Sequence, residues 1–310
     1  MNDSFIKAEA YSPAGITSFF EILDEQIDGT PKKDPLQIGA RGGGFVIEKG
    51  VLTRAFVKES ERSKIDITIN GKNSPEAETT KEVVRTLTKK AEQNYMVKIE
   101  HEIEVPIESG FGTSGAGALS TALVMNEVLG LGLTYNELGR VAHIAEIKCK
   151  TGLGTVGPIM LGGCILTIEG GAPGFNLIDR IPLSPNYKII SIHFGKIPTK
   201  SIITNHKNKL KINKWGNMAL NDILREPNIE NFMISSKKFA DKIGLMTENV
   251  SRAIKLMESA GAIGATQNMI GESVHSVVDE NSAEKVTKAL KKIGKNIIVT
   301  NIDIKGARLI

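Results

Sequence analysis

The fold of this chain is decided by the stretch Pro106-Ile107-Glu108-Ser109-Gly110-Phe111-Gly112-Thr113-Ser114-Gly115-Ala116-Gly117. Before it, residues 96–106 alternate apolar and charged side chains, a pattern typical of a half-buried strand. After it, residues 114–129 carry apolar side chains at helical spacing and end at glycines. Glycines allow the backbone to approach an anion, and the free amides at the start of a helix favour negative charge. The stretch therefore predicts a phosphate-binding loop between a strand and a helix.

Two familiar glycine motifs, the Walker A loop and the dinucleotide fingerprint, fit this loop poorly. A Walker A loop needs a lysine after its second glycine, and Ala116 stands there. The string Gly110-x-Gly112-x-x-Gly115 satisfies the dinucleotide fingerprint, but that fingerprint belongs to a unit that returns to a strand. Here a capping box, Thr134 to Glu137, instead begins a second helix over residues 135–149. A plain structural turn would leave the hydroxyls at the helix cap unexplained, so a phosphate site of another class is favoured.

The rest of the chain predicts two domains of mixed α/β structure. A cluster of turn-forming residues, Tyr11 to Gly15, is expected to end the first strand, and residues 24–35 are expected to form a polar loop. We expect an N-terminal domain of residues 1–181 and a C-terminal domain of residues 182–310. Expected strands cover residues 5–10, 45–57, 64–70, 163–169, 187–194 and 297–304, and expected helices cover residues 75–93, 217–224, 229–243, 248–259 and 283–293.

Composition excludes several classes of protein. Of 310 residues, 41% are hydrophobic and 24% charged, and the net charge of +4 gives no reason to expect a polyanionic partner. The lysine-rich residues 196–214 lack interleaved aromatics, so we expect a solvated loop or a rim that attracts phosphate, and no nucleic acid. Cys149 and Cys164 form no ligand-like pair and predict reduced thiols. The longest apolar stretch, residues 156–168, is interrupted by glycines and too short to span a bilayer. With no leader sequence at the start, we expect a cytoplasmic protein without membrane contact.

The glycine loop resembles that of the GHMP kinase superfamily, which includes galactokinase and the homoserine, mevalonate and phosphomevalonate kinases. The superfamily pattern is P-x-x-x-G-L-G-S-S-A, and residues 106–115 are P-I-E-S-G-F-G-T-S-G. Nearly the whole chain further resembles the archaeal-type pantoate kinases. The blocks that carry this resemblance are Ser12 to Glu21, Ala40 to Gly44, Ala142 to Glu146 with Thr151 to Gly154, Gln267 to Glu272, and Asp303 to Arg308. Several separated blocks in the family's order are much more specific than one glycine loop.

The resemblance implies an α/β (α+β) fold, the GHMP kinase fold, with an N-terminal domain like ribosomal protein S5 and a ferredoxin-like C-terminal domain. It implies ATP-dependent phosphorylation of (R)-pantoate to 4-phosphopantoate, an early step of coenzyme A biosynthesis, with ATP and pantoate as the small-molecule partners. Mg²⁺ would be the cofactor, since phosphoryl transfer needs the charge on the γ-phosphate to be neutralised. The oligomeric state stays open, a homodimer included.

The resemblance also assigns the nucleotide site. ATP would contact Gly110, Phe111, Gly112, Thr113, Ser114, Gly115, Ala116 and Gly117. Ser114 would bind Mg²⁺ through its hydroxyl and Glu146 through its carboxylate, and both count as catalytic. Oxygen ligands of this kind suit a hard cation that keeps several of its waters. Without the resemblance, Ser114 would be a plain helix N-cap and Glu146 a solvated helix residue.

Two side chains are candidates for binding the substrate. Arg41 stands among glycines, a setting that suits bidentate capture of a carboxylate, and pantoate carries one. His143 precedes Glu146 by three residues on the same helix face and could contact the substrate. A surface arginine and a core or capping histidine are the simpler alternatives.

Two departures from the family pattern bear on the chemistry. Thr155 follows T-G-L-G, where related pantoate kinases place an aspartate, and a threonine cannot act as a carboxylate base. Ala14-Gly15 stands where the family usually has Gly-His. Glu21, Asp24 and Asp179 could replace the base, and nothing in the sequence selects one. Two alternatives stay open: another GHMP-type alcohol kinase, acting for example on mevalonate or homoserine, and a nucleotide-binding regulator without turnover.

Overall fold

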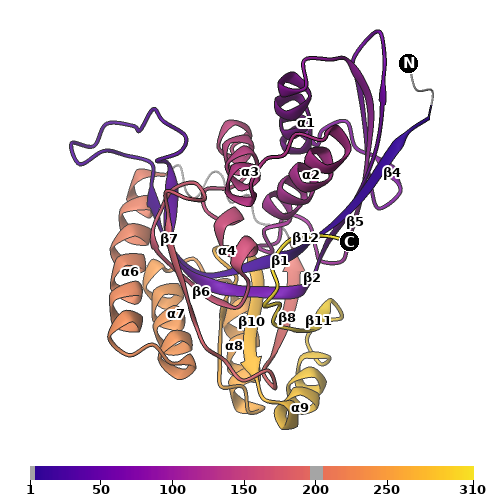
Figure 1. Ribbon diagram of the computed structural model, residues 1–310. Helices are drawn as coiled ribbons and strands as arrows, with labels where there is room; N and C mark the ends of the chain where they lie inside the picture. The colour runs from indigo at the N-terminus through magenta and orange to yellow at the C-terminus, as the bar shows by residue number, and fades with distance from the viewer. Residues whose placement is uncertain (1–3, 196–204) are drawn as a thin grey trace.

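The larger of two β-sheets is built mostly by the N-terminal half of the chain (Figure 1). The computed structural model describes residues 4–195 and 205–310. The strands of this sheet are β1 (Ile6–Leu23), β2 (Gly39–Glu59), β3 (Lys64–Ile69), β4 (Lys72–Asn73), β5 (Tyr95–Ile103), β6 (Cys164–Glu169), β7 (Leu177–Ile181) and β12 (Arg308–Leu309). Within the described residues their order is β12-β1-β2-β5-β3-β4, and β6 pairs with β2 and with β7.

The first strand is much longer than expected. β1 runs through Tyr11 to Gly15, so the prediction that this cluster ends the strand is wrong. The ladder between β1 and β2 continues past it, with a register shift between Pro13 and Ala14. A proline cannot donate to a ladder, and an irregularity of this kind accommodates it. β12 pairs only with Ala10 and Tyr11, so Pro13 also lies at an edge of the sheet on that side.

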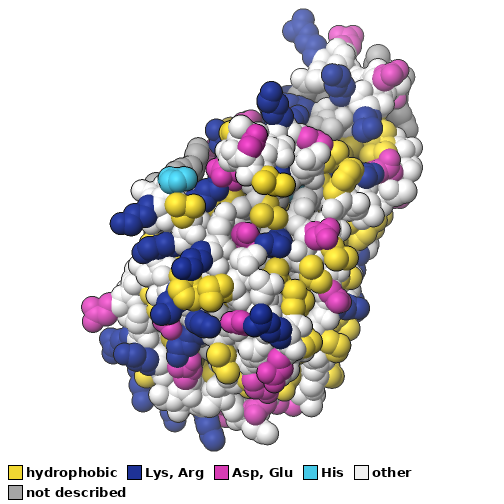
Figure 2. All heavy atoms as spheres, turned by 90° about the vertical axis from the view of Figure 1, so that its left-hand side faces the viewer, with side chains coloured by type: hydrophobic (Ala, Val, Ile, Leu, Met, Phe, Trp, Pro, Cys, Tyr) yellow, Lys and Arg dark blue, Asp and Glu magenta, His cyan; other side chains and the backbone are white. Residues whose placement is uncertain are grey.

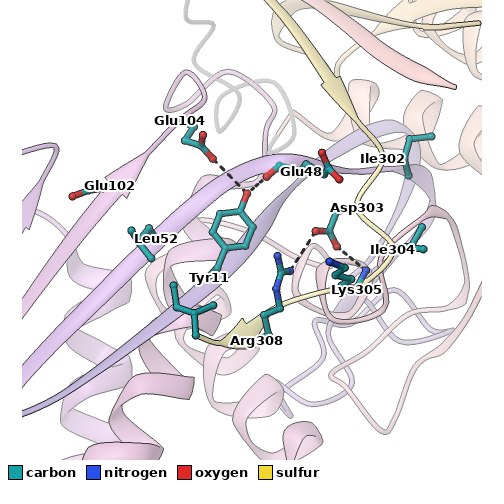
Figure 3. Close-up of a pocket in the computed structure, with 11 residues that line it drawn as sticks. Tyr11, Glu48, Leu52, Glu102, Glu104, Ile302, Asp303, Ile304, Lys305 and Arg308 are labelled. Atoms are coloured by element: carbon teal, nitrogen blue, oxygen red, sulfur yellow. Dashed lines mark hydrogen bonds and ion pairs between the residues drawn. The ribbon is translucent and has the colours of Figure 1, made fainter. Parts of the chain in front are cut away.

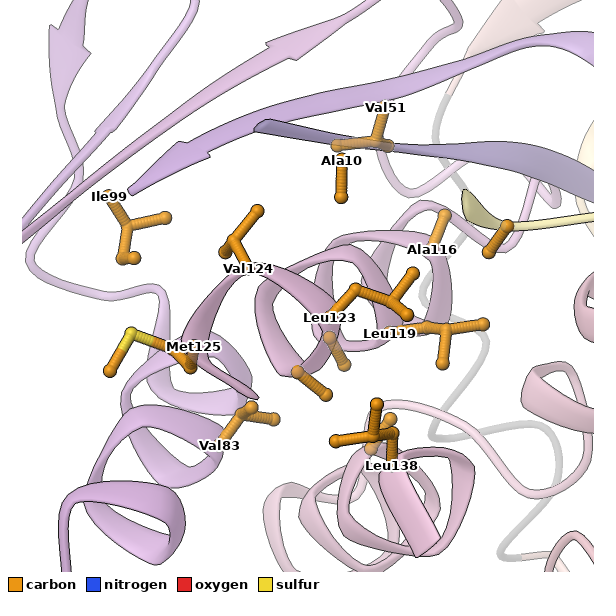
Figure 4. Close-up of a cluster of buried hydrophobic side chains, with 14 of the residues drawn as sticks. Ala10, Val51, Val83, Ile99, Ala116, Leu119, Leu123, Val124, Met125 and Leu138 are labelled. Atoms are coloured by element: carbon orange, nitrogen blue, oxygen red, sulfur yellow. The ribbon is translucent and has the colours of Figure 1, made fainter. Parts of the chain in front are cut away.

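Three helices cover one face of this sheet: α1 (Glu78–Lys90), α2 (Thr113–Leu129) and α3 (Tyr135–Cys149). Figure 4 shows α2 between the sheet residue Val51 and the side chains Val83 of α1 and Leu138 of α3. Leu119 and Val124 of α2 are fully buried, and burying such a side chain contributes about 2 kcal/mol. Enclosure on all sides explains why α2 consists of small and apolar residues without a polar stripe. The predicted helices over residues 114–129 and 135–149 are confirmed.

The second sheet belongs to the C-terminal part of the chain. Its strands are β8 (Lys188–Gly195), β9 (Gly264–Gln267), β10 (Glu272–Val278) and β11 (Ile297–Asn301), in the order β11-β8-β10-β9. Its helices are α6 (His206–Arg225), α7 (Ile229–Ile243), α8 (Glu248–Ser259) and α9 (Glu280–Leu290). The predicted boundary at residue 181 falls between β7 and β8, although β12 returns to the first sheet, and it stays a proposal.

Aromatic side chains join the two parts in one core. Phe232 of α7 packs edge-on against Phe19 of β1, with ring centroids 5.7 Å apart, and against Phe45 of β2 at 5.1 Å. Phe239, about two turns further along the same face of α7, packs in the same way against Phe20. Edge-to-face pairs add about 1 kcal/mol each to the burial of the rings. Helix α7 of the C-terminal part is therefore held against the first sheet by a packed interface.

Two segments differ from the sequence predictions. The short helix α4 (Val156–Leu161) occupies part of the apolar stretch for which no helix was expected. From His206 the lysine-rich stretch is the start of α6, so the expected loop is wrong there, and residues 196–204 lie outside the described part. Asn205 caps this helix, and Ile212 is buried on its inner face, a periodicity that the abundant lysines obscure. No helix among the described residues has the length and apolar character needed to cross a membrane.

Candidate active site

The predicted phosphate loop enters α2 with its backbone arranged for an anion. The φ angle is positive at every second residue, with 59° at Glu108, 81° at Gly110 and 59° at Gly112. Alternation of this kind turns successive amides towards one side, which creates a concavity that binds anions. Gly112 is the N-cap of α2, and among the described residues no side chain caps the helix. Its first amides therefore stay available for phosphate oxygens.

The loop is closely packed by its neighbours. A Cβ placed on Gly112 would lie 2.5 Å from the Cγ2 methyl of Thr155, and one on Gly110 would lie 3.0 Å from the Cβ of Asn268. Ser109 Oγ lies 3.4 Å from the Nε2 atom of His193 on β8. The C-terminal part of the chain thus supports the loop, and glycine is required there by space as well as by φ.

Glu146, on α3, points its carboxylate at the head of α2. The residue is only 2% exposed, and the hydroxyls of Ser114 and Thr151 lie close enough to its carboxylate to lower its pKa by hydrogen bonding. The backbone of Gly152 packs against the carboxylate, since a Cβ there would lie 2.5 Å from Oε1. Burial raises the pKa of Glu146 to about 7, and the two hydrogen bonds oppose this rise only in part. No cationic side chain of the described residues contributes to that balance, so Glu146 is a buried carboxylate without a countercharge.

The residues around Glu146 fit a divalent cation bound together with phosphate. A buried carboxylate without a countercharge is costly, and a bound cation would supply one. The available donors are the oxygens of Glu146 and Ser114, which are the ligand type that Mg²⁺ takes when phosphates and waters complete its shell. No group of three or more His, Cys, Asp or Glu side chains that could hold a metal occurs in the described ranges. The donor set therefore suits a cation delivered with a nucleotide.

Thr155 is the residue before α4, and it faces the phosphate loop. Its methyl group would lie 2.5 Å from a Cβ placed on Gly112 and 3.2 Å from a Cβ placed on Gly15. The aspartate expected from the family pattern is thus absent from the position closest to the loop. The three carboxylates considered as replacements already have partners: Glu21 with Arg41, Asp24 with Lys209, and Asp179 with the amide of Arg180.

Arg41 forms an ion pair across β1 and β2. Its Nε and Nη2 atoms both donate to Oε2 of Glu21, at 2.9 and 2.6 Å, and Asn217 of α6 donates to the same oxygen at 3.4 Å. The arginine is 29% exposed, so it faces solvent in part. Its neighbour Ala40 packs against Gly154, the residue before Thr155. Arg41 therefore lies near the loop that carries Thr155, and Glu21 already occupies part of its guanidinium group.

His143, a candidate for contact with the substrate, has two structural partners. The ring is buried, and its Nε2 atom lies 3.2 Å from the carbonyl of Pro35 and 3.0 Å from that of Ile38. Burial lowers its pKa, and the two carbonyls oppose this in part, so the neutral ring donates from Nε2. His143 thereby ties the segment before β2 to the helix that carries Glu146.

A cavity of about 530 Å³ lies beside the C-terminal residues (Figure 3). Its lining includes Tyr11 and the ion pair of Arg308 with Asp303, 3.4 Å long. Ala10 faces the core under α2, so Tyr11 faces the opposite side of the strand. The further acidic side chains in the lining are Glu48, Glu102 and Glu104. These carboxylates outnumber the cationic side chains of the lining, Lys305 and Arg308, so the cavity suits phosphates less well than the glycine loop, which stays the predicted nucleotide site.

Sequence reasoning missed two hydroxyl groups beside Glu146. Thr151 hydrogen-bonds to the carboxylate, and Thr79, in the first turn of α1, lies 3.0 Å from Thr151 and 3.4 Å from Ser114 between hydroxyl oxygens. Thr151 lies in the T-G-L-G block, which could have indicated its role. Nothing in the sequence near Thr79 distinguishes it from an ordinary polar residue at the start of a helix.

A glycine loop heading a buried helix, in a fold of these two sheets, defines a GHMP kinase, and the description "GHMP kinases N terminal domain" matches residues 78–163. A pantoate kinase from Methanocaldococcus jannaschii is 33% identical to the chain over 293 residues, which are 94% of this chain and 99% of the relative. A pantoate kinase from Thermococcus kodakarensis is 29% identical over 286 residues, 91% of each chain. A solved structure described as a phosphotransferase related to the CoA biosynthesis pathway has a TM-score of 0.89, 27% identity and 98% coverage of both chains.

The chain belongs to the pantoate kinase family. It is an ATP-dependent small-molecule kinase, and the predicted α/β (α+β) GHMP kinase fold is confirmed.

Proposed function

We propose that this chain transfers the γ-phosphoryl group of Mg²⁺-ATP to the primary hydroxyl of (R)-pantoate, giving ADP and 4-phosphopantoate for coenzyme A biosynthesis. The observation that carries the proposal is that the buried carboxylate of Glu146 lies beside the Ser114 hydroxyl at the head of α2. It occurs in a chain whose full-length relatives include pantoate kinases. The same proposal includes a cytoplasmic location and the absence of nucleic-acid and membrane partners. It also allows the protein to form a homodimer.

The phosphate loop and the two oxygen donors would bind the nucleotide. Amides of residues 110–117 would donate to the phosphate oxygens, while Ser114 and Glu146 would hold Mg²⁺, which neutralises charge on the transferred group. The substrate hydroxyl oxygen forms a bond to the γ-phosphorus as the bond from that phosphorus to the ADP oxygen breaks. No covalent enzyme intermediate is involved, so the protein contributes positioning and electrostatic stabilisation.

The presence of Thr155 is compatible with turnover. In a loose phosphoryl-transfer transition state the attacking hydroxyl loses its proton late, so a strong base beside it is not required. We propose that the hydroxyl proton passes to water or to an oxygen of the transferred group. The hydroxyl of Thr155 would help to orient the substrate at the mouth of the loop.

Arg41 is the proposed anchor of the pantoate carboxylate. A guanidinium has five N–H donors, and Glu21 accepts from two of its nitrogens. The remaining donors can form a further bond to a carboxylate. We propose that His143 acts on the substrate site indirectly, by fixing residues 35–38, since two carbonyls already accept from its Nε2 atom.

The test measures ADP release by the purified protein with Mg²⁺-ATP and one alcohol at a time: (R)-pantoate, mevalonate or homoserine. We expect kcat/KM for pantoate to exceed that for the other two by at least about 100-fold, because a site built for a particular polar group rejects analogues that lack it. Faster turnover of mevalonate or homoserine would assign the chain to another GHMP activity. Binding of ATP without ADP release on any of the three alcohols would favour the regulator.

A further inference from the structure

Three hydroxyl groups and one carboxylate form a connected chain beside the phosphate loop. Ser114 comes from the head of α2, Thr79 from the first turn of α1, and Thr151 from the residues after α3. Ser114 Oγ lies 3.4 Å from Thr79 Oγ1, which lies 3.0 Å from Thr151 Oγ1. The hydroxyls of Ser114 and Thr151 also lie close enough to the Glu146 carboxylate to lower its pKa by hydrogen bonding. Thr79 is 7% exposed and does not itself hydrogen-bond to the carboxylate.

The single proton of each hydroxyl limits how this chain can be arranged. A hydroxyl has one proton to donate and two lone pairs that accept. When Ser114 and Glu146 both turn a lone pair to the same cation, the Ser114 proton, which can otherwise point to Glu146, must point to another acceptor on the protein side. Thr79 Oγ1 is within reach as that acceptor, and its own proton can then pass to Thr151. The proton of Thr151 points to Glu146, so every donor in the chain has an acceptor.

We propose that Thr79 is a positioning residue for the nucleotide-bound cation. It accepts the Ser114 proton and so directs the Ser114 lone pair to the cation. Through Thr151 it also orients the Glu146 carboxylate, which leaves an oxygen of that group for the same ion. This inference rests on the proposed function, because it assigns Ser114 and Glu146 as the ligands.

The next residue, Thr80, provides a matched comparison. It lies in the same turn of α1 and is 6% exposed, against 7% for Thr79. Its hydroxyl points to a different partner, the Nε2 atom of His101, at 3.0 Å. The two threonines are thus almost equally buried, and they differ in the group that each hydroxyl contacts. A purely structural role would make their valine variants behave alike.

The experiment titrates Mg²⁺ into the protein with a non-hydrolysable ATP analogue and follows binding by calorimetry, for wild type, Thr79→Val, Thr79→Ser and Thr80→Val. Valine keeps the shape of threonine and replaces the hydroxyl by a methyl group. We expect Thr79→Val to need about 10-fold more Mg²⁺ for half-maximal binding, the cost typical of losing a group that orients a metal ligand. Thr79→Ser, which restores the hydroxyl, should bind like wild type. Thr80→Val should also keep the wild-type Mg²⁺ requirement although its melting temperature falls.

Three results would overturn the inference. In the first, Thr79→Val binds the analogue with the wild-type Mg²⁺ requirement. In the second, Thr80→Val raises that requirement as much as Thr79→Val does, which would assign both effects to packing. In the third, binding to the wild type does not depend on Mg²⁺, and this result would also remove the proposed function on which the inference rests.

Discussion

At the scale of single residues, Gly112 is the position where backbone and neighbours constrain the site most tightly. Its φ is 59°, and a Cβ there would lie 2.5 Å from Thr155 Cγ2. We expect Gly112→Ala to lower the free energy of unfolding by about 1–2 kcal/mol, the cost of a left-handed non-glycine residue. It should also raise KM for ATP, because the loop must move away from Thr155. Steady-state kinetics and urea unfolding measure the two effects.

Gly130 is the matched control for that variant. It caps the other end of α2 with a φ of 60°, and nothing lies within 4 Å of a Cβ placed on it. Gly130→Ala should therefore cost similar stability and leave KM for ATP unchanged. Equal rises of KM in the two variants would argue that Gly112 has no special part in the phosphate site.

The sequence predicts single site residues where a motif names them, and fails where a partner lies far away in the chain. The glycine loop predicted the head of α2 from local chemistry, and the resemblance added Ser114 and Glu146. It did not predict that Glu21 would pair with Arg41, because these residues meet only through the β1–β2 register. The position of Thr79 beside Ser114 depends likewise on the packing of α1 against α2.

At the scale of elements, a buried histidine joins β5 to the helices above it. His101 is 3% exposed; its Nδ1 atom lies 2.8 Å from Thr53 Oγ1 and its Nε2 atom 3.0 Å from Thr80 Oγ1. Burial lowers its pKa from 6.5 to about 4. Between these two values the unfolded chain binds a proton and the folded chain does not. Stability is therefore complete above pH 6.5 and is lost as the pH falls towards 4, by about 1.4 kcal/mol per pH unit for this group.

Urea unfolding at pH 7.5, 5.5 and 5 measures this dependence. His275, whose pKa burial lowers to about 3, contributes with the same sign in the wild type. In His101→Gln the free energy of unfolding should change less steeply with pH between 5.5 and 5, because one histidine no longer contributes to this dependence. A variant with the full wild-type slope would show that His101 does not stay neutral in the folded protein.

Helices with a clear apolar face or cap were predicted closely, as α3, α7 and α8 show. The errors lie where local signals compete with the sheet. Pro13 indicated the end of a strand, yet the long ladder with β2 carries β1 past it through a register shift. Lysines at the start of α6 concealed a helix whose inner face packs on the core.

At the scale of the whole molecule, the candidate active site contains residues from both parts of the chain. The phosphate loop lies between β5 and α2 of the first part, while Asn268 and His193 of the second part pack against it. Phe232 joins the same two parts from the other side of β1 and β2 through its contacts with Phe19 and Phe45. No periodicity in the sequence indicates such long-range packing, and only the resemblance to a family implied the complete fold.

The central claim is that phosphoryl transfer takes place at the head of α2 with Ser114 as a ligand. The most direct test compares pantoate-dependent ADP release by Ser114→Ala and Ser120→Ala. Ser120 lies on the same helix and is fully buried; it donates to the carbonyl of Ala116 at 2.8 Å and lies 2.6 Å from Thr53 Oγ1. We predict that Ser114→Ala lowers kcat/KM by about 100-fold or more, the cost of losing one preorganised group that stabilises the transition state, while Ser120→Ala keeps wild-type turnover. Wild-type turnover in Ser114→Ala would contradict the account.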